Sequence, residues 1–236
     1  MTGAETAARA LAMVLAAEPR TAAELEAALG GDVAQALIEL ERAGLVEPDR
    51  AGAWRSGPAI VRHAQLAALA ELAAPVLAGL AAESGETANL IVARAGATVA
   101  IAQADGRHLL GATNWIGRPL PLHCSAAGKV LLAFGAATLA DGPLERFGSA
   151  TIVDRDALQG DLVAARERGY STLVDELEDG LSAVGAPVRD RGGAVVAAIT
   201  LAGATLRLPA ARLRLLGRLA VEQADALSAL LAELAA

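Results

Sequence analysis

Three scarce residue types lie close together in residues 121–133, which read PLHCSAAGKVLLA. This stretch contains Lys129, the only lysine beside 19 arginines, together with the only cysteine, Cys124, and one of three histidines, His123. A thiol next to an imidazole could form a nucleophile and its base, and a Gly-Lys pair at the start of a helix could hold an anion. Both kinds of chemistry have to be weighed against simpler roles.

The nucleophile hypothesis is weak on local geometry. Adjacent residues on a strand point to opposite faces, so His123 and Cys124 would be directed apart. No acidic third member and no nucleophile elbow accompany them. A lone cysteine is more often a small buried hydrophobe. We therefore expect no catalytic residue and no enzyme, with a hydrolase using Cys124 and His123 as the remaining enzymatic alternative.

Lys129 has two open interpretations. One turn into a helix, its side chain could extend to solvent or pair with a carboxylate. It could instead hold a pocket loop or an anionic ligand. The stretch is not a phosphate-binding P-loop, because the upstream Gly and the Ser or Thr after the Lys are missing. A run of acidic residues lies further along the chain, made of Asp175, Glu176, Glu178 and Asp179.

Carboxylates as close together as those of this acidic run could bind a metal ion, but the surrounding sequence argues against a metal site. Neither Cys nor suitably spaced His lies near it in the sequence, and such ligands accompany carboxylates in many protein metal sites. We expect a solvated loop there, and neither a metal nor a cofactor in the chain.

Composition limits the classes of protein that the 236 residues can form. The net charge of −7 argues against bulk attraction to nucleic acid or to anionic membranes. A single cysteine permits no internal disulfide, which fits a reducing compartment. The first 20 residues lack the basic start of a signal peptide, and the uncharged apolar stretch 72–82 is too short to span a bilayer. These features predict a soluble, cytoplasmic protein with no membrane partner.

Residues 1–57 have the pattern of a winged helix-turn-helix. Helical spacing covers residues 4–17, and Thr21 with Glu24 forms a capping-box pattern for a second helix. Asp32 can cap a third helix that ends near Gly44, and residues 45–55 suggest a small hairpin. Three helices followed by a hairpin is the order of a winged helix-turn-helix.

Residues 58–84 predict a long linker helix. Pro58 suits a helix start, and Pro75 should kink or interrupt the helix. An apolar stripe runs along it and could pair with a partner chain or pack on its own domain; its members are Leu66, Leu69, Leu72, Val76 and Leu80.

Residues 85–236 predict a separate α+β domain. Two strands within 88–105 flank a turn at 94–97, and a third strand is expected over 107–111. Helices are expected near 125–134 and 156–168, a strand hairpin over 181–189 and 194–201, and a last helix from Pro209 towards Glu233. This order favours an antiparallel sheet covered by helices.

The motifs resemble the IclR family of bacterial transcriptional regulators. Residues 121–133 match the family's lPlhasaaGKa.LA signature with little departure. A second block follows the family's rGya.d.eE...G...aaPv.d..g.vvaais.sGp in the same order and spacing. It is made of Arg168-Gly169-Tyr170-Ser171, Asp175-Glu176, Gly180, Ala186-Pro187-Val188, Asp190, Gly193 and VVAAITLAG. The resemblance implies a winged-helix DNA-binding domain, a linker helix and a GAF-like effector-binding domain, working as homodimers or dimers of dimers.

The resemblance also implies an effector pocket beside the helix that follows Ser125. Small side chains there would let a ligand approach the backbone, and free amides at a helix start favour an anionic group. The lining is mostly apolar, so we expect a small organic acid with an apolar body. The implied positions are Leu109, Ala112, Cys124, Ser125, Ala126, Ala127, Gly128, Leu181, Ala183, Thr200 and Ala202.

DNA reading would fall to the outward face of the third helix. Gln35 can contact adenine with two hydrogen bonds, and Arg50 and Arg55 of the hairpin could hold phosphates, as could Thr21. Ala34, Ile38, Glu39 and Arg42 share that helix face. Residues 1–62 nevertheless carry 6 Arg against 9 acidic residues. The main expectation is a ligand-responsive regulator that binds a palindromic operator. The alternative is a sensor that has lost strong DNA binding and acts through protein contacts.

Overall fold

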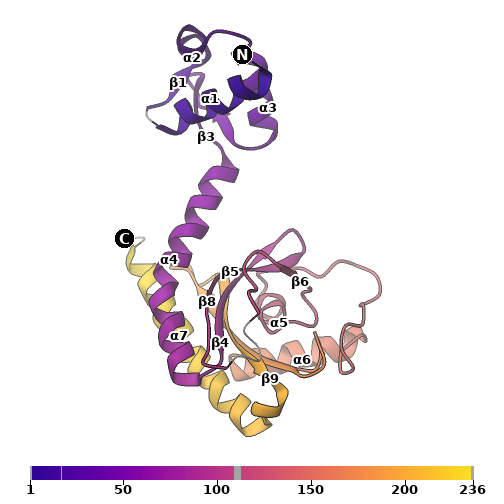
Figure 1. Cartoon of the computed structure of the whole chain (residues 1–236). Helices are drawn as coiled ribbons and strands as arrows, with labels where there is room; N and C mark the ends of the chain where they lie inside the picture. The colour runs from indigo at the N-terminus through magenta and orange to yellow at the C-terminus, as the bar shows by residue number, and fades with distance from the viewer. Residues whose placement is uncertain (1, 17, 109–112, 235–236) are drawn as a thin grey trace. The chain divides into compact units, whose positions relative to one another are not determined.

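The computed structural model describes residues 2–16, 18–108 and 113–234. The chain divides into two compact units, residues 1–69 and 70–236 (Figure 1). Each unit has its own hydrophobic core, and the two are described separately below.

The first unit is a helical domain with a small antiparallel sheet. Its helices are α1 (Gly3–Ala16), α2 (Ala22–Leu29) and α3 (Val33–Arg42). The strands β1 (Arg20–Thr21), β2 (Val46–Pro48) and β3 (Ala53–Ser56) pair in the order β1-β3-β2. The predicted caps are present, because the Thr21 hydroxyl accepts from the Glu24 amide and Asp32 caps α3. This arrangement confirms the winged helix-turn-helix.

Helix α4 (Pro58–Ser84) contains the boundary between the two units. Of the kink or interruption predicted at Pro75, the interruption is wrong, because the helix runs through this residue without a break; a kink stays a prediction. A proline removes one backbone hydrogen-bond donor from a helix. Pro75 lies on an exposed side of α4, so only this one hydrogen bond is lost and the helix continues. By length and composition α4 is the single described helix that could cross a membrane, a test that the core helix of a soluble protein also passes.

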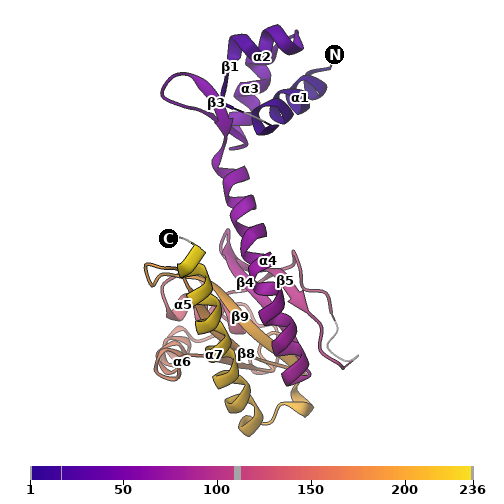
Figure 2. The ribbon, with the colours of Figure 1, turned by 90° about the vertical axis from the view of Figure 1, so that its left-hand side faces the viewer.

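The second unit is built on a six-stranded antiparallel sheet in the order β6-β5-β4-β9-β8-β7. The strands are β4 (Thr87–Arg94), β5 (Ala97–Ala104), β6 (Pro119–Leu120), β7 (Ser171–Val174), β8 (Leu181–Arg189) and β9 (Val195–Ala204). Helix α7 (Ala210–Leu234), which follows the short 3₁₀ helix η1 (Thr205–Arg207), lies with the end of α4 over one face. Helices α5 (Ala126–Ala133) and α6 (Arg155–Arg168) lie over the other (Figures 1 and 2). The fold is therefore α+β, as predicted.

Local sequence signals account for the main turns of this sheet. The β4–β5 turn places Ala95 and Gly96 at positive φ, and the β8–β9 turn does so at Gly193. These are the conformations that tight hairpins require. The third strand predicted over 107–111 is not found at the described residues 107 and 108; the strand that pairs with the outer edge of β5 is β6. Residues 109–111 lie outside the described residues.

Candidate functional site

The first turn of α5 lies directly against the sheet. A Cβ on Gly128 would lie 2.5 Å from Leu122 Cα and 2.6 Å from its carbonyl carbon. On β8, a Cβ at Gly185 would lie 3.0 Å from the carbonyl oxygen of Ala126. The Ser171 hydroxyl on β7 donates to that same oxygen at 2.6 Å. Two glycines and one serine thus fix the start of this helix.

A small pocket with a cavity volume of about 40 Å³ opens beside this helix start. Its lining comes from α5, from β4, β8 and β9, and from the segments around β6 and β7, and it contains no charged side chain. The lining residues are Asn89, Ile91, Trp115, Leu120, Ser125, Ala126, Ala127, Leu173, Leu177, Leu181, Ala183, Thr200 and Ala202. The arrangement suits a small ligand with an apolar body.

Most of the residues predicted for an effector site are brought together here. Seven of them line the pocket: Ser125, Ala126, Ala127, Leu181, Ala183, Thr200 and Ala202. Cys124 and Gly128 are buried beside the pocket without lining it. Leu109 and Ala112 lie outside the described residues. That these residues bind an effector remains a prediction.

Six lining residues were missed from the sequence, and Asn89 is the most informative of them. Asn89 on β4 pairs directly with Thr200 on β9, so the two side chains share one face of the sheet. The sequence offers no local signal for this pairing, because the two positions are 111 apart along the chain. The register of the sheet is what brings Asn89 to the pocket.

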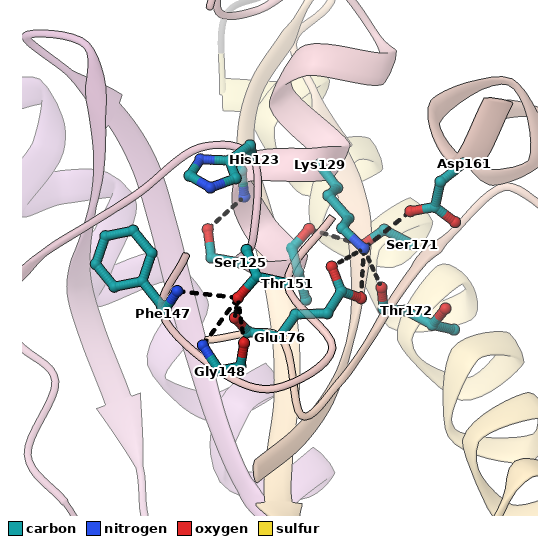
Figure 3. Close-up of polar contacts among 12 residues, drawn as sticks. His123, Ser125, Lys129, Phe147, Gly148, Thr151, Asp161, Ser171, Thr172 and Glu176 are labelled. Atoms are coloured by element: carbon teal, nitrogen blue, oxygen red, sulfur yellow. Dashed lines mark hydrogen bonds and ion pairs between the residues drawn. The ribbon is translucent and has the colours of Figure 1, made fainter. Parts of the chain in front are cut away.

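Lys129 forms a buried ion cluster next to the pocket (Figure 3). Its side chain is 1% exposed, and its ammonium lies 2.5 Å and 2.6 Å from the two carboxylate oxygens of Glu176. Asp161 on α6 lies 2.9 Å away, and the carbonyl oxygen of Thr172 accepts at 3.1 Å. The predicted pairing with a carboxylate is confirmed, whereas extension to solvent is wrong.

The ion cluster corrects one prediction about the acidic run 175–179. Glu178 and Asp179 are exposed, but Glu176 is buried, because the β7–β8 loop folds its side chain under α5. Burial raises the pKa of Glu176, and the Lys129 charge opposes that rise. Within the described ranges, no group of three His, Cys, Asp or Glu could hold a metal ion.

The loop that carries Glu176 also carries a pocket residue. Leu177 lines the pocket immediately after Glu176. The Glu176 carbonyl oxygen accepts from the Gly148 amide at 3.1 Å and from the Thr151 hydroxyl at 2.5 Å. Lys129 therefore connects the helix and the loop that form two walls of the pocket.

The Cys124 and His123 pair does not have the geometry of a nucleophile and base. The Cys124 side chain is fully buried, and desolvation raises the pKa of its thiol to about 12. His123 Nε2 lies 2.8 Å from the carbonyl oxygen of Glu145 and is therefore engaged with the backbone (Figure 3 shows the ring). A protonated, inaccessible thiol is not a nucleophile.

The residues predicted to contact DNA lie on the surface of the first unit. Ala34, Gln35, Ile38 and Arg42 are exposed on one face of α3, as the helical spacing predicts. Thr21 is the N-cap of α2, Arg50 lies in the β2–β3 turn, and Arg55 is on β3. Binding of DNA at these positions remains a prediction.

Three of these side chains are already engaged with acidic neighbours. The Gln35 amide donates to Glu39 at 2.9 Å, and Arg55 pairs with Glu47 at 2.7 Å. The Thr21 hydroxyl donates to Glu24 at 2.9 Å. Contact with a phosphate or a base would have to compete with these partners.

Comparison with known proteins agrees with this architecture. Residues 61–229 match the family described as bacterial transcriptional regulator IclR C-terminal. The chain is 35% identical over 206 residues to the HTH-type transcriptional regulator BhcR of Paracoccus denitrificans, covering 83% of this chain and 74% of that protein. It is 35% identical over 182 residues to the HTH-type transcriptional repressor AllR of Klebsiella pneumoniae, covering 75% of this chain and 66% of that one.

A solved structure shows the same fold along nearly the whole chain. The crystal structure of the Thermotoga maritima IclR superimposes with a TM-score of 0.65 at 22% identity, covering 96% of this chain and 97% of that one. The matched relatives are transcriptional regulators, not enzymes. The chain belongs to the IclR family of bacterial transcriptional regulators.

Proposed function

We propose that this protein is a DNA-binding transcriptional regulator that responds to a small organic acid with an apolar body. The observation that carries the proposal is the pocket at the start of α5, which has an apolar lining and no charged side chain. Backbone amides at a helix N-terminus attract an anionic group, while the alanines and leucines around them favour hydrocarbon. The relatives named above, described as regulators and repressors, support the DNA-binding part of the proposal.

The proposed DNA contacts come from the outward face of α3 and from the hairpin. Two chains, or a dimer of dimers, would present paired α3 helices to a palindromic operator. A ligand would act only through its difference in affinity between two arrangements of those helices. The pocket residues and the DNA-facing residues thus have separate roles and can be tested separately.

A second candidate function has a specific observation in its favour. The exposed face of α3 and the hairpin carry Glu39 and Glu47 beside Gln35 and Arg55. Phosphate neutralisation dominates DNA affinity in most complexes, and these acids oppose it. The second candidate is an effector sensor that no longer binds DNA strongly and acts through protein contacts.

In vitro selection of genomic fragments separates the two candidates. The purified full chain is incubated with fragments of the source genome at about 0.1 M salt, with and without a mixture of small metabolites. We expect enrichment of a palindromic sequence, because paired α3 helices impose two-fold symmetry on the site. A folded oligomer that enriches no fragment in either condition would favour the sensor that does not bind DNA.

Filling the pocket is expected to abolish the response to ligand. Ala183 on β8 lines the pocket, and Ala183→Phe adds a ring to a space that must be empty for binding. The matched control is Ala194→Phe at the exposed β8–β9 turn. Operator affinity without ligand should be unchanged in both variants, and the metabolite mixture should alter it only in the control. Retention of the response by Ala183→Phe would contradict the proposed site.

A further inference from the structure

Helix α7 buries one side against the sheet and exposes leucines on the other. Figure 2 shows α7 and the C-terminal part of α4 in front of the sheet. Leu215 is 52% exposed and Leu230 is 39% exposed. Leu219, which is partly buried, and the exposed Ala226 lie between them. Spacings of four, seven and four residues align these four side chains along one side of the helix, and they are called the α7 stripe below.

A groove runs beside the α7 stripe, between α7 and the end of α4. It has a cavity volume of about 410 Å³, larger than that of the pocket beside α5. Leu215 and Leu219 of the stripe line this groove, and Glu83 and Ser84 of α4 line it as well. Single exposed leucines are common on protein surfaces, whereas aligned leucines at a groove of this size indicate a contact surface.

The charges of α7 are divided between its two halves. Residues 210–221 contain three arginines and no acidic residue, and residues 222–234 contain three acidic residues and no basic one. The arginines are Arg212, Arg214 and Arg218, and the acidic residues are Glu222, Asp225 and Glu233. The helix dipole favours the reverse order, with acids near the N-terminus and bases near the C-terminus. The stability of the helix itself therefore does not explain this division.

Four of these charges have no partner within the described part of the chain. Arg214, Arg218, Glu222 and Asp225 are exposed, and their side chains make no hydrogen bond or ion pair with another described residue. Arg212 differs, because it donates to the carbonyl oxygen of Ser84 at 2.7 Å. Spacings of four, four and three residues place the four unpaired charges in a row along one edge of the α7 stripe.

A second copy of α7 in antiparallel orientation would cover the stripe and pair the charges. If Leu219 packs against Leu219 of the second copy, a two-fold axis passes beside it. Arg218 then lies opposite Glu222 of the second copy, because the two positions are at similar distances on either side of the axis. Arg214 lies opposite Asp225 for the same reason. Symmetry repeats each of these contacts once.

Other occupants of this surface fit its charges less well. A parallel copy would place arginines against arginines and acids against acids, and like charges in an interface are strongly unfavourable. Nucleic acid or an anionic membrane would be attracted to the first half of α7 and repelled by the second half. The division of charge therefore favours an antiparallel copy of the same helix.

We propose that two copies of the chain associate through their α7 stripes in antiparallel orientation, with the arginines of each copy paired with the acidic residues of the other. This contact lies on the face of the sheet opposite to α5 and its pocket (Figure 1). The inference goes beyond the proposed function, because it assigns the surface that joins two copies and does not depend on which ligand or operator is bound.

Charge reversal in the full chain tests this interface. One variant carries Arg214→Glu and Arg218→Glu, and the other carries Glu222→Arg and Asp225→Arg. Each variant alone would set like charges against each other, so the dissociation constant of the interface should rise about a hundredfold or more. At micromolar concentration, the mass measured by sedimentation velocity should fall to half that of the parent.

Mixing the two variants should restore the mass of the parent. In the mixed pair each acidic half faces a basic half again, so the interface regains its complementarity. All four substitutions in one chain should restore the mass as well, because both halves then change sign together. Loss of folding in the separate variants could not be reversed by mixing.

A matched control changes the net charge without touching α7. Arg94→Glu with Arg118→Glu alters the charge by the same amount as the first variant, at exposed positions at the end of β4 and just before β6. This control should keep the mass of the parent.

Cysteine cross-linking tests the direction of the two helices. Leu219→Cys places a thiol beside the axis, so mild oxidation should join two copies by a disulfide. Ala211→Cys should not cross-link, because its two copies would lie about 24 Å apart along the helices. The native thiol of Cys124 is buried and does not compete.

Several outcomes would overturn the proposal. They are a parent chain that sediments as a monomer, an unchanged mass in both charge variants, and a reduced mass that mixing does not restore. Equal cross-linking of Ala211→Cys and Leu219→Cys would also overturn it, since that result indicates a parallel pair. The operator selection and the pocket-filling variants test the proposed function separately, so either proposal can fail without the other.

Discussion

Replacing Lys129 by Met is expected to lower the free energy of unfolding of the second unit by about 3–5 kcal/mol. The substitution keeps most of the side-chain volume but removes the ammonium from between Glu176 and Asp161. One partner, Glu176, then remains buried without its cation. The measurement is urea unfolding followed by the emission of Trp115, in a Trp54→Phe background so that only the second unit is reported.

The cost of Lys129→Met should depend on pH with a defined sign. Burial raises the pKa of Glu176 and the Lys129 charge opposes this, so removing the charge raises that pKa further in the folded state. A folded-state pKa above the unfolded value gives stability that is present at low pH and lost as the pH rises. The free energy of unfolding of the variant should therefore approach that of the parent as the pH is lowered from neutral towards the ordinary titration range of a carboxyl group.

A neighbouring cation provides the control for this experiment. Arg168 also faces Asp161, but at 3.8 Å and with a side chain that is 36% exposed. Arg168→Met should cost less than about 1 kcal/mol, because solvent screens a partly exposed pair. A cost for Lys129→Met that is equally small, or that does not change with pH, would show that the buried cluster contributes little to stability.

Gly128→Ala is expected to destabilise the second unit by about 3 kcal/mol and to abolish ligand binding. Intrinsic helix propensity alone predicts the opposite sign, a gain of about 1 kcal/mol. The steric term should win, because the new Cβ would meet backbone atoms of Leu122, which cannot rotate away as the end of a side chain can. The start of α5 would have to move away from the segment before it, and the pocket wall with it.

Gly160→Ala on α6 separates the steric effect of a new Cβ from the effect of helix propensity. A Cβ at Gly160 meets no atom within 4 Å, so only the propensity term remains, and stability should rise by about 0.5–1 kcal/mol. The same urea titration, applied to both variants, gives the comparison. If Gly128→Ala were as stable as the parent, the close approach of α5 and Leu122 would not constrain the pocket.

Structural features that depend on a few neighbouring residues could be predicted from the sequence. The capping pattern of Thr21 and Glu24 and the turn at residues 94–97 each depend on a few neighbouring residues, and the structure confirms both. The small residues beside the pocket were found because Ala126 and Ala127 stand in a motif shared with a known family. Gly128 was predicted for the same site, but it does not line the pocket, and its missing side chain accommodates the backbone of Leu122.

Features that depend on long-range pairing were not predictable from the same sequence. Glu176 stands among exposed acids, and only the folding of its loop brings it to Lys129, 47 positions earlier. Asn89 interrupts an apolar run, and its sequence neighbours say nothing of the partner strand that places it in the pocket. Charged and polar side chains are exposed on average, and only the tertiary packing determines that Glu176 and Asn89 are buried.

The burial of Lys129 also has a consequence for the chemical reactivity of the protein. Because it is the only lysine among 20 basic residues and is 1% exposed, reagents that acylate lysine find no accessible target in the folded second unit. Acylation of this amine requires that α5, α6 and the β7–β8 loop separate first. The rate at which Lys129 is acetylated, followed by mass spectrometry, therefore reports how often this region opens, and a bound ligand that joins the pocket walls would slow it.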